Sequence, residues 1–171
     1  LAMEAGIPPG VLNVVNGLGA NAGAALAAHR DVDVLAFTGS TNVGRSIMEA
    51  AAKSNLKRVW LELGGKSANI IFPDADVEKA ANTAAWSIFF NQGEMCTAGS
   101  RLLVHESLHD EVVQRVLAIA ETMQPANPLS AGAPAGALVN ATHLGRVHGM
   151  VEQAKGEGSR LIVGGAPTMV E

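Results

Sequence analysis

Short apolar runs alternate along the chain with longer segments in which apolar residues recur every three or four positions. The runs predict strands at residues 11–15, 34–37, 57–63, 69–72, 101–105 and 160–163. The periodic segments predict helices at 20–29, 41–54, 76–90 (with Asp76 as N-cap), 107–123 and 142–156, after a last helical turn at 1–6. Strands that alternate with helices indicate an α/β fold with mainly parallel sheet.

Two adjacent glycines, Gly64 and Gly65, interrupt this pattern between two predicted strands. The backbone can change direction there, so we expect a boundary between two parts of the chain. The 171 residues suffice for one domain of ordinary size or for parts of two. Hydrophobic residues make up 48% and charged residues 16% of the chain, which is typical of a globular protein.

Composition excludes several classes of protein. No apolar run reaches the roughly 18 residues that a membrane span needs, and the net charge of −4 without a basic cluster argues against nucleic acid as a partner. One cysteine makes no internal disulfide and no zinc spacing, so we expect no metal site and a reducing, cytoplasmic location. Residues 1–6 lack the features of a signal peptide and start abruptly, which predicts a chain that begins inside a longer protein.

The single cysteine, Cys96, follows an apolar segment and a glycine break within residues 89–101. Small neighbours leave room for a substrate, and nearby backbone amides could stabilise an oxyanion, which suits a nucleophile. A lone cysteine is also commonly buried and inert. The stretch by itself does not decide between these interpretations.

Two glycine-rich loops run from a predicted strand into a predicted helix. Residues 17–23 have the spacing GxGxxxG of a dinucleotide phosphate loop, but no acidic residue clearly ends the next strand, so a close-packed turn is favoured. Residues 37–44 add two hydroxyls at a helix start, where free N–H groups and the helix dipole attract phosphate. An ordinary Ser/Thr helix cap explains the second loop equally well.

A carboxylate, Glu62, lies at the end of an apolar predicted strand. Ionised carboxylates seldom lie in such surroundings without a role or a partner. Apolar surroundings disfavour the ionised form, which suits a general base. The alternative is an ion pair with Lys66 or Arg58.

Three stretches in order, 37–40, 61–67 and 89–96, resemble the signatures of the NAD(P)-dependent aldehyde dehydrogenase superfamily. The separation between Glu62 and Cys96 matches the family too. The resemblance runs through the whole chain and covers about the middle third of a usual member. It implies an aldehyde dehydrogenase-like α/β fold, in which residues 1–63 end a Rossmann-type cofactor domain and residues 64–171 begin an α/β catalytic domain.

The resemblance assigns roles to individual residues. Cys96 would attack the aldehyde to give a thiohemiacetal, which loses hydride to NAD or NADP and leaves a thioester. Glu62 would activate the water that hydrolyses this thioester, and the Cys96 N–H would form half of the oxyanion hole. The residues expected at the cofactor are Gly39, Ser40, Val43, Gly44, Leu63 and Gly19. Those expected to line a substrate tunnel are Phe90, Met95 and Thr97.

Glu62 favours hydrolytic oxidation over transfer of the acyl group to a thiol such as CoA. Residues 57–62 and 91–99 look most like bacterial enzymes of polyamine catabolism, which oxidise γ-glutamyl-γ-aminobutyraldehyde or 4-guanidinobutyraldehyde. The resemblance also implies a dimeric or tetrameric parent. It puts the upstream oxyanion asparagine and the ribose-binding residues outside this chain, so we expect the chain alone to be inactive. The alternative is a truncated, non-catalytic remnant that binds partners or persists as a fold.

Overall fold

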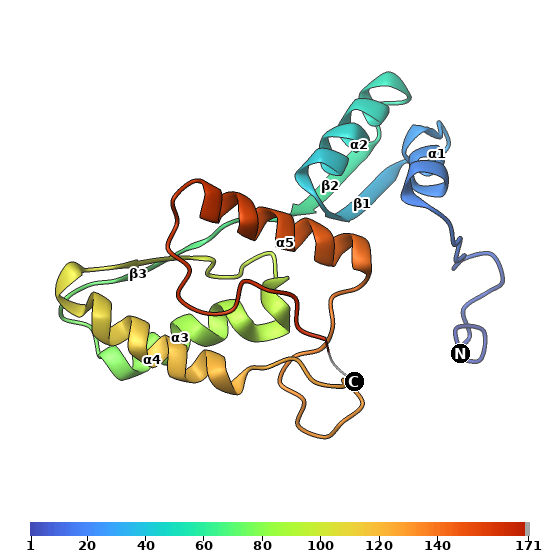
Figure 1. The fold of residues 1–171 in the computed structure, drawn as a ribbon. Coiled ribbons are helices and arrows are strands. Elements are labelled where there is room, and N and C mark those ends of the chain that lie inside the picture. Colours follow the sequence, from blue (N-terminus) through green and yellow to red (C-terminus); the bar gives the residue numbers. More distant parts are fainter. Residues whose placement is uncertain (170–171) are drawn as a thin grey trace. The chain divides into compact units, whose positions relative to one another are not determined.

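The computed structural model describes residues 1–169 of the chain (Figure 1). The chain divides between Gly64 and Gly65 into two compact units, here called unit 1 (from Leu1 to Gly64) and unit 2 (from Gly65 onward). The cofactor-binding role of the first part and the catalytic role of the second stay predictions.

Unit 1 is a parallel strand pair joined by a helix. Its elements are the π-helical turn η1 (Gly19–Gly23), α1 (Ala24–Ala28), β1 (Val34–Gly39), α2 (Thr41–Lys53) and β2 (Arg58–Leu63). The two strands pair in parallel, with Val34 opposite Arg58 and Gly39 opposite Leu63. The predicted strands at 34–37 and 57–63 and the helix at 41–54 are therefore confirmed, with ends shifted by a few residues.

A buried lysine holds the two helices of unit 1 together. The side chain of Lys57 is only 7% exposed. Its Nζ donates to the carbonyl oxygen of Ala27 at 2.5 Å and to Oγ of Ser54 at 3.0 Å. Ala27 lies in the last turn of α1 and Ser54 is the C-cap of α2. The ammonium group thus lies where helix dipoles favour a cation.

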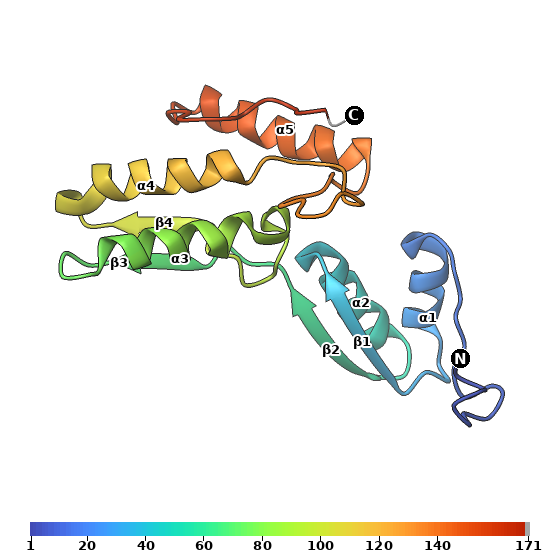
Figure 2. The ribbon, with the colours of Figure 1, turned by 90° about the horizontal axis from the view of Figure 1, so that it is seen from below.

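Unit 2 is a second parallel strand pair, covered by helices. Its elements are β3 (Ala68–Ile71), α3 (Val77–Phe89), the 3-10 turns η2 (Phe90–Gly93) and η3 (Glu106–Leu108), β4 (Arg101–Val104), α4 (His109–Thr122) and α5 (Ala141–Gly156). Ala68 pairs with Arg101 and Ile71 with Val104. Figure 2 shows α3 and α4 alongside this pair. Ile71, Ala81 and Val112 form the buried core between strands and helices.

Local capping explains where two helices of unit 2 begin. Oδ1 of Asp76 accepts the N–H of Lys79 at 3.1 Å, which confirms the predicted N-cap of α3. Oδ1 of Asn140 accepts the N–H of His143 at 2.8 Å and starts α5 in the same way. No helix among residues 1–169 combines the length and the apolar character that crossing a bilayer requires.

Two predicted strands are wrong. Residues 11–15 and 160–163 form no ladder, and their apolar side chains are largely exposed. A strand is stabilised by pairing with a neighbour, and the described residues provide none for either run. At residues 1–6, where the end of a helix is predicted, the structure has hydrogen-bonded turns and no assigned helix. These turns are closed by Gly6, whose φ of 85° permits the 3.0 Å bonds from Gly6 N–H to Met3 O and from Ile7 N–H to Ala2 O.

Candidate active site

The backbone that leads to Cys96 leaves α3 through three left-handed residues. Their φ values are 49° at Asn91, 55° at Gln92 and 74° at Gly93. Non-glycine residues in this region store about 1–3 kcal/mol of strain each. At Gly93 a Cβ would also lie 2.9 Å from the carbonyl oxygen of Ile88. The approach to the thiol therefore has a strained geometry that requires glycine at its last position.

The backbone after Cys96 is fastened to α3 at Ser87. The N–H of Gly99 donates to the carbonyl oxygen of Ser87 at 3.1 Å. A Cβ on Gly99 would lie 2.5 Å from Oγ of Ser87, so a larger residue there would displace the Ser87 hydroxyl. The Nδ2 of Asn69 in β3 donates to the same Oγ at 3.4 Å, and Ala98 is buried beside it. The strand β3, the helix α3 and the loop that carries Cys96 (residues 94–100, here called the thiol loop) therefore meet at Ser87.

Two consecutive turns carry the thiol. The N–H of Glu94 donates to Asn91 O at 3.0 Å in the turn before Cys96, and the N–H of Ala98 donates to Met95 O at 3.1 Å in a turn that contains Cys96. Cys96 itself is half-buried. A Cβ on Gly65 would lie 3.5 Å from the carbonyl oxygen of Cys96, so the beginning of unit 2 passes close to the main chain of Cys96.

The predicted tunnel residues lie on the same loop with their surfaces open. Phe90 is 55% and Met95 44% exposed, and Thr97 is exposed as well. Nδ2 of Asn91 contacts the sulfur of Met95 at 3.9 Å. These three residues lie within six positions of Cys96 along the chain, and their role as walls of a tunnel stays a prediction.

In the predicted cofactor loop of unit 1, Gly39, Ser40 and Gly44 each have a structural role within the unit. Oγ of Ser40 accepts the N–H of Val43 at 3.3 Å and caps α2. A Cβ on Gly39 would lie 2.5 Å from the ring of Phe37, and one on Gly44 would lie 2.9 Å from Cδ2 of Leu63. Cap and close packing thus account for these residues without a ligand, and contact with a pyrophosphate stays a prediction. At Gly19 the surrounding space is open.

Glu62 lies on the uncovered face of β2. Val59, Leu61 and Leu63 alternate with it and are partly buried, whereas Glu62 is exposed opposite Thr38 of β1. The apolar surroundings expected for Glu62 are therefore wrong within unit 1, because the strand's two-residue period turns this side chain away from α2.

The predicted alternative role of Glu62, an ion pair with Arg58, does not form within the described residues of unit 1, because the two residues lie four positions apart on the same strand, about 13 Å along its axis. The Lys66 ammonium donates to the carbonyl oxygen of Gly65 at 3.3 Å. Glu62 thus keeps an exposed carboxylate at the end of its strand, just before the boundary between the units.

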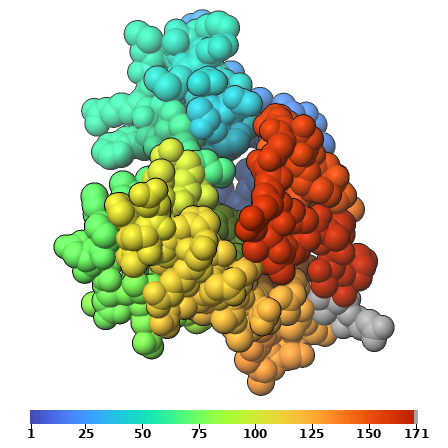
Figure 3. Space-filling view, turned by 60° about the vertical axis from the view of Figure 1, so that its left-hand side comes forward, coloured from blue at the N-terminus to red at the C-terminus, as the bar shows by residue number. Residues whose placement is uncertain are grey.

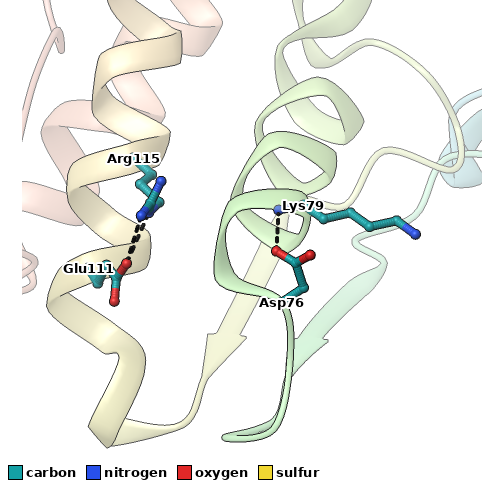
Figure 4. A network of polar contacts seen from close by, with 4 residues as sticks. All are labelled: Asp76, Lys79, Glu111 and Arg115. Carbon is teal, nitrogen blue, oxygen red and sulfur yellow. Dashed lines mark hydrogen bonds and ion pairs between the residues drawn. The ribbon is translucent and has the colours of Figure 1, made fainter.

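A groove of about 580 Å³ lies between α3 and α4. Figure 3 shows the surface of α4 in yellow beside the green segment that includes α3. The groove is lined by Asp76, Glu78, Lys79, Asn82, Arg115, Ala118 and Ile119. Figure 4 shows that two charged residues of the groove make contacts within their own helices: Asp76 caps α3, and Arg115 pairs with Glu111 at 2.9 Å. No lining residue belongs to the thiol loop, so the groove is not part of the candidate site.

Metal ligands do not gather in the part of the chain that the structure describes: no three His, Cys, Asp or Glu side chains are placed to hold an ion.

Sequence reasoning missed Ser87, Asn69 and His143 at this site. Ser87 and Asn69 fasten the loop, and Nε2 of His143 lies 3.1 Å from Oε1 of Glu94. These contacts join residues far apart in the sequence, so no local pattern marks them. The one available signal is Ser87, a polar residue in an otherwise apolar stretch of α3.

The aldehyde dehydrogenase family model matches residues 1–171, which includes the whole thiol loop. The chain belongs to the aldehyde dehydrogenase family. Over 165 residues this family member is 50% identical to the mitochondrial aldehyde dehydrogenase of Homo sapiens, a match that covers 96% of the chain and 32% of that protein. It is 47% identical to the NADP/NAD-dependent aldehyde dehydrogenase PuuC of Escherichia coli, over 96% of the chain and 33% of that protein.

The fold of this family member is shared with solved structures. The crystal structure of γ-glutamyl-γ-aminobutyraldehyde dehydrogenase from Burkholderia cenocepacia is 57% identical and superposes with a TM-score of 0.92, covering 96% of the chain and 33% of that structure. The predicted aldehyde dehydrogenase-like α/β fold is therefore confirmed. The chain spans about a third of the length of the relatives that it matches.

Proposed function

We propose that this chain is the part of an NAD(P)-dependent aldehyde dehydrogenase that carries the nucleophile and the general base. One observation supports this most strongly: within a family match over the whole chain, Cys96 lies in a hydrogen-bonded turn that directly follows a strained, left-handed turn. A thiol held rigidly among small residues can be approached closely by a substrate carbonyl. An inert structural cysteine would not require that strain.

The proposed reaction uses Cys96 twice. Its sulfur forms a bond to the aldehyde carbon and gives a thiohemiacetal, while the Cys96 N–H donates to the developing oxyanion. A bound, oxidised nicotinamide would accept the hydride, with its electron pair, from this carbon, which would leave a thioester on Cys96. Glu62 accepts a proton from the water that attacks this thioester. The carbon–sulfur bond breaks, the carboxylic acid leaves and the thiolate returns.

The start of α2 fits a phosphate-bearing cofactor. Ser40, Thr41 and Asn42 are exposed, and the 13-residue helix directs its first N–H groups and the positive end of its dipole outward there. Gly39, Ser40, Val43 and Gly44 would hold the pyrophosphate of NAD or NADP, with Leu63 toward the nicotinamide and Gly19 toward the adenine. The E. coli relative is named for the use of both cofactors.

The proposed substrates are aminoaldehydes such as those of polyamine catabolism. The solved structure that is 57% identical carries the name of a γ-glutamyl-γ-aminobutyraldehyde dehydrogenase. Phe90, Met95 and Thr97 would contact the aldehyde's carbon chain. A panel of aminoaldehydes and simple alkyl aldehydes, compared by kcat/KM on the longer parent protein, tests this class. Equal or higher values for the alkyl aldehydes would contradict it.

The activity is tested by Cys96→Ala in the parent. We expect NAD(P)H formation from aldehyde to fall by about 1,000-fold or more, because the covalent route is lost. Circular dichroism of the variant checks that the fold is intact. As a matched control, His109→Ala removes an exposed pair on α4 (2.8 Å to Asp110) and should leave turnover unchanged. Substantial turnover by the alanine variant would disprove the role of Cys96.

A truncated, non-catalytic remnant would retain every one of these residues, so their presence does not distinguish it from the enzyme. The intact mass of the protein in its source cells distinguishes the two. A mass near that of the relatives would favour the enzyme, and a mass equal to this chain's 17.5 kDa would favour the remnant.

A further inference from the structure

The chain after α4 returns to the loop that leads to Cys96: it contacts that loop at His143 and passes close to it at Gly136. Nε2 of His143, in the first turn of α5, lies 3.1 Å from Oε1 of Glu94. At the other point a Cβ on Gly136 would lie 3.3 Å from Nε2 of Gln92. Gln92 and Glu94 are in the turn immediately before the thiol. Residues 136–143 therefore form a support against that turn.

Both residues of the His143–Glu94 contact have a main chain fixed by a hydrogen bond. The main chain of His143 is fixed because its N–H donates to the Asn140 cap at 2.8 Å. The N–H of Glu94 closes the left-handed turn by donating to Asn91 O at 3.0 Å. An ionised carboxylate only accepts, so the imidazole Nε2–H donates to Glu94. The start of the 16-residue helix α5 also favours a negative charge beside it.

A support of this kind is what the strained turn requires. Left-handed conformations at Asn91 and Gln92 persist only where the surroundings hold them. On the other side of the thiol, the bond from Gly99 to Ser87 provides such a hold. On the near side, besides the packing of Gly93 against α3, the turn is contacted by His143 and closely approached by Gly136.

We propose that His143 is a positioning residue for the thiol: it holds Glu94, and through Glu94 the turn that presents Cys96. This inference rests on the proposed function only in treating Cys96 as the nucleophile. The hold on the loop is a property of the chain itself. In this proposal the segment between α4 and α5 and the start of α5 support the turn before Cys96.

The first test is amide hydrogen exchange of the 171-residue chain, read by mass spectrometry. In His143→Ala, peptides that cover residues 90–100 should exchange about twofold to fivefold faster, which is the range expected for losing a partly exposed pair (side chains 35% and 40% exposed). Peptides of α4 should not change. His143→Gln keeps an N–H donor at this position and should restore most of the protection.

Two controls separate a local hold from general destabilisation. His109→Ala removes a similar imidazole–carboxylate pair, with Asp110, at the start of α4 and should leave residues 90–100 unchanged. In a double-mutant cycle, adding Glu94→Gln to His143→Ala should add no further acceleration, because the same contact is already lost.

Several results would overturn the proposal. These are exchange within about 1.5-fold of the wild type in His143→Ala, equal acceleration in residues 90–100 and in α4, or additive effects in the cycle. Exchange of residues 90–100 in the wild type at the rate of an unstructured peptide would overturn it too, since no held loop would exist.

The catalytic consequence is measured in the parent enzyme. His143→Ala should lower kcat about tenfold, since misplacing a reacting group by about 1 Å can cost about 100-fold, while KM for the aldehyde changes less than about twofold. Rescue of kcat by His143→Gln is expected. An unchanged kcat would overturn the positioning role. A wild-type parent that oxidises no aldehyde would instead contradict the proposed function, and the exchange experiment would still judge the hold on the loop.

Discussion

Gly93 meets two constraints at once, and each alone would select glycine. Its φ of 74° is costly for any side-chain-bearing residue, and the space where a Cβ would lie is taken by the backbone oxygen of Ile88 at 2.9 Å. A flexible side chain could yield, but a helix carbonyl cannot move without disturbing α3. The end of α3 and the direction of the thiol loop therefore depend on this residue.

Gly93→Ala should destabilise unit 2 by about 1–3 kcal/mol through backbone strain and the clash. Gly145→Ala is the matched control, because Gly145 lies inside α5 with open space around its Cα. There alanine should add up to about 1 kcal/mol of stability. Urea unfolding followed by Trp86 fluorescence, in a Trp60→Phe background, measures both. Equal effects at the two sites would contradict the argument.

Glu62 is proposed to act after hydride transfer, because it would activate water and not receive the hydride. In the parent, Glu62→Gln should lower steady-state turnover and still give a burst of about one equivalent of NAD(P)H per active site. Rapid mixing with excess aldehyde measures the burst. Its loss together with turnover would mean that Glu62 is needed to activate Cys96 or to position the substrate.

At the scale of elements, Lys57 links helices α1 and α2 by hydrogen bonds. Helices α1 and α2 end near each other, and the buried ammonium donates to Ala27 O in one and to the Ser54 cap of the other. Removing it leaves a carbonyl and a hydroxyl without their donor. The loss of such charged hydrogen bonds outweighs the relief of desolvating a lysine if the geometry is good.

Lys57→Met should therefore accelerate amide exchange in residues 24–53, by an amount that corresponds to about 1–3 kcal/mol. Residues 77–122 serve as an internal reference. Lys53→Met is the control, since Lys53 is exposed in its 3.4 Å pair with Glu49 and should change exchange little. Slower exchange in Lys57→Met would show that the desolvation cost of the charge dominates.

At the scale of the whole molecule, the chain exposes surfaces that a larger protein would cover. Each sheet among the described residues has two strands, so every strand has an unpaired edge. Large apolar side chains are exposed on the strands as well, including Trp60 at 68% and Ile70 at 59%. The relatives are about three times longer, which provides the material to cover them. We therefore expect the chain alone to self-associate at micromolar concentrations, measured by sedimentation velocity; a monomer across that range would contradict this.

The 171 residues alone should not oxidise aldehydes steadily. The resemblance puts the second oxyanion donor outside this chain, and losing one such donor costs about 100- to 1,000-fold. The residues expected to hold the two riboses lie outside as well, so the cofactor would be poorly oriented. The test is the purified chain, its mass confirmed, incubated with NAD or NADP and a panel of aminoaldehydes. Turnover near that of the full-length enzyme would show that other residues suffice.

The sequence by itself determined the elements whose bonds are local. The helices at 41–53 and 77–89 follow from apolar spacing and from Ser40 and Asp76 as caps, because helix hydrogen bonds join residues only four apart. It also determined the family, since ordered motifs around Glu62 and Cys96 are read directly from the chain.

Tertiary structure alone decided which apolar runs become strands and what holds the thiol. The runs at 11–15 and 160–163 are as apolar as those at β1 and β3, but a strand needs a partner that its own sequence does not contain. The burial of Lys57, the anchoring of Gly99 by Ser87 and the contact between His143 and Glu94 join residues distant in sequence. Such contacts depend on how the elements pack, and only the folded chain brings their atoms within bonding distance.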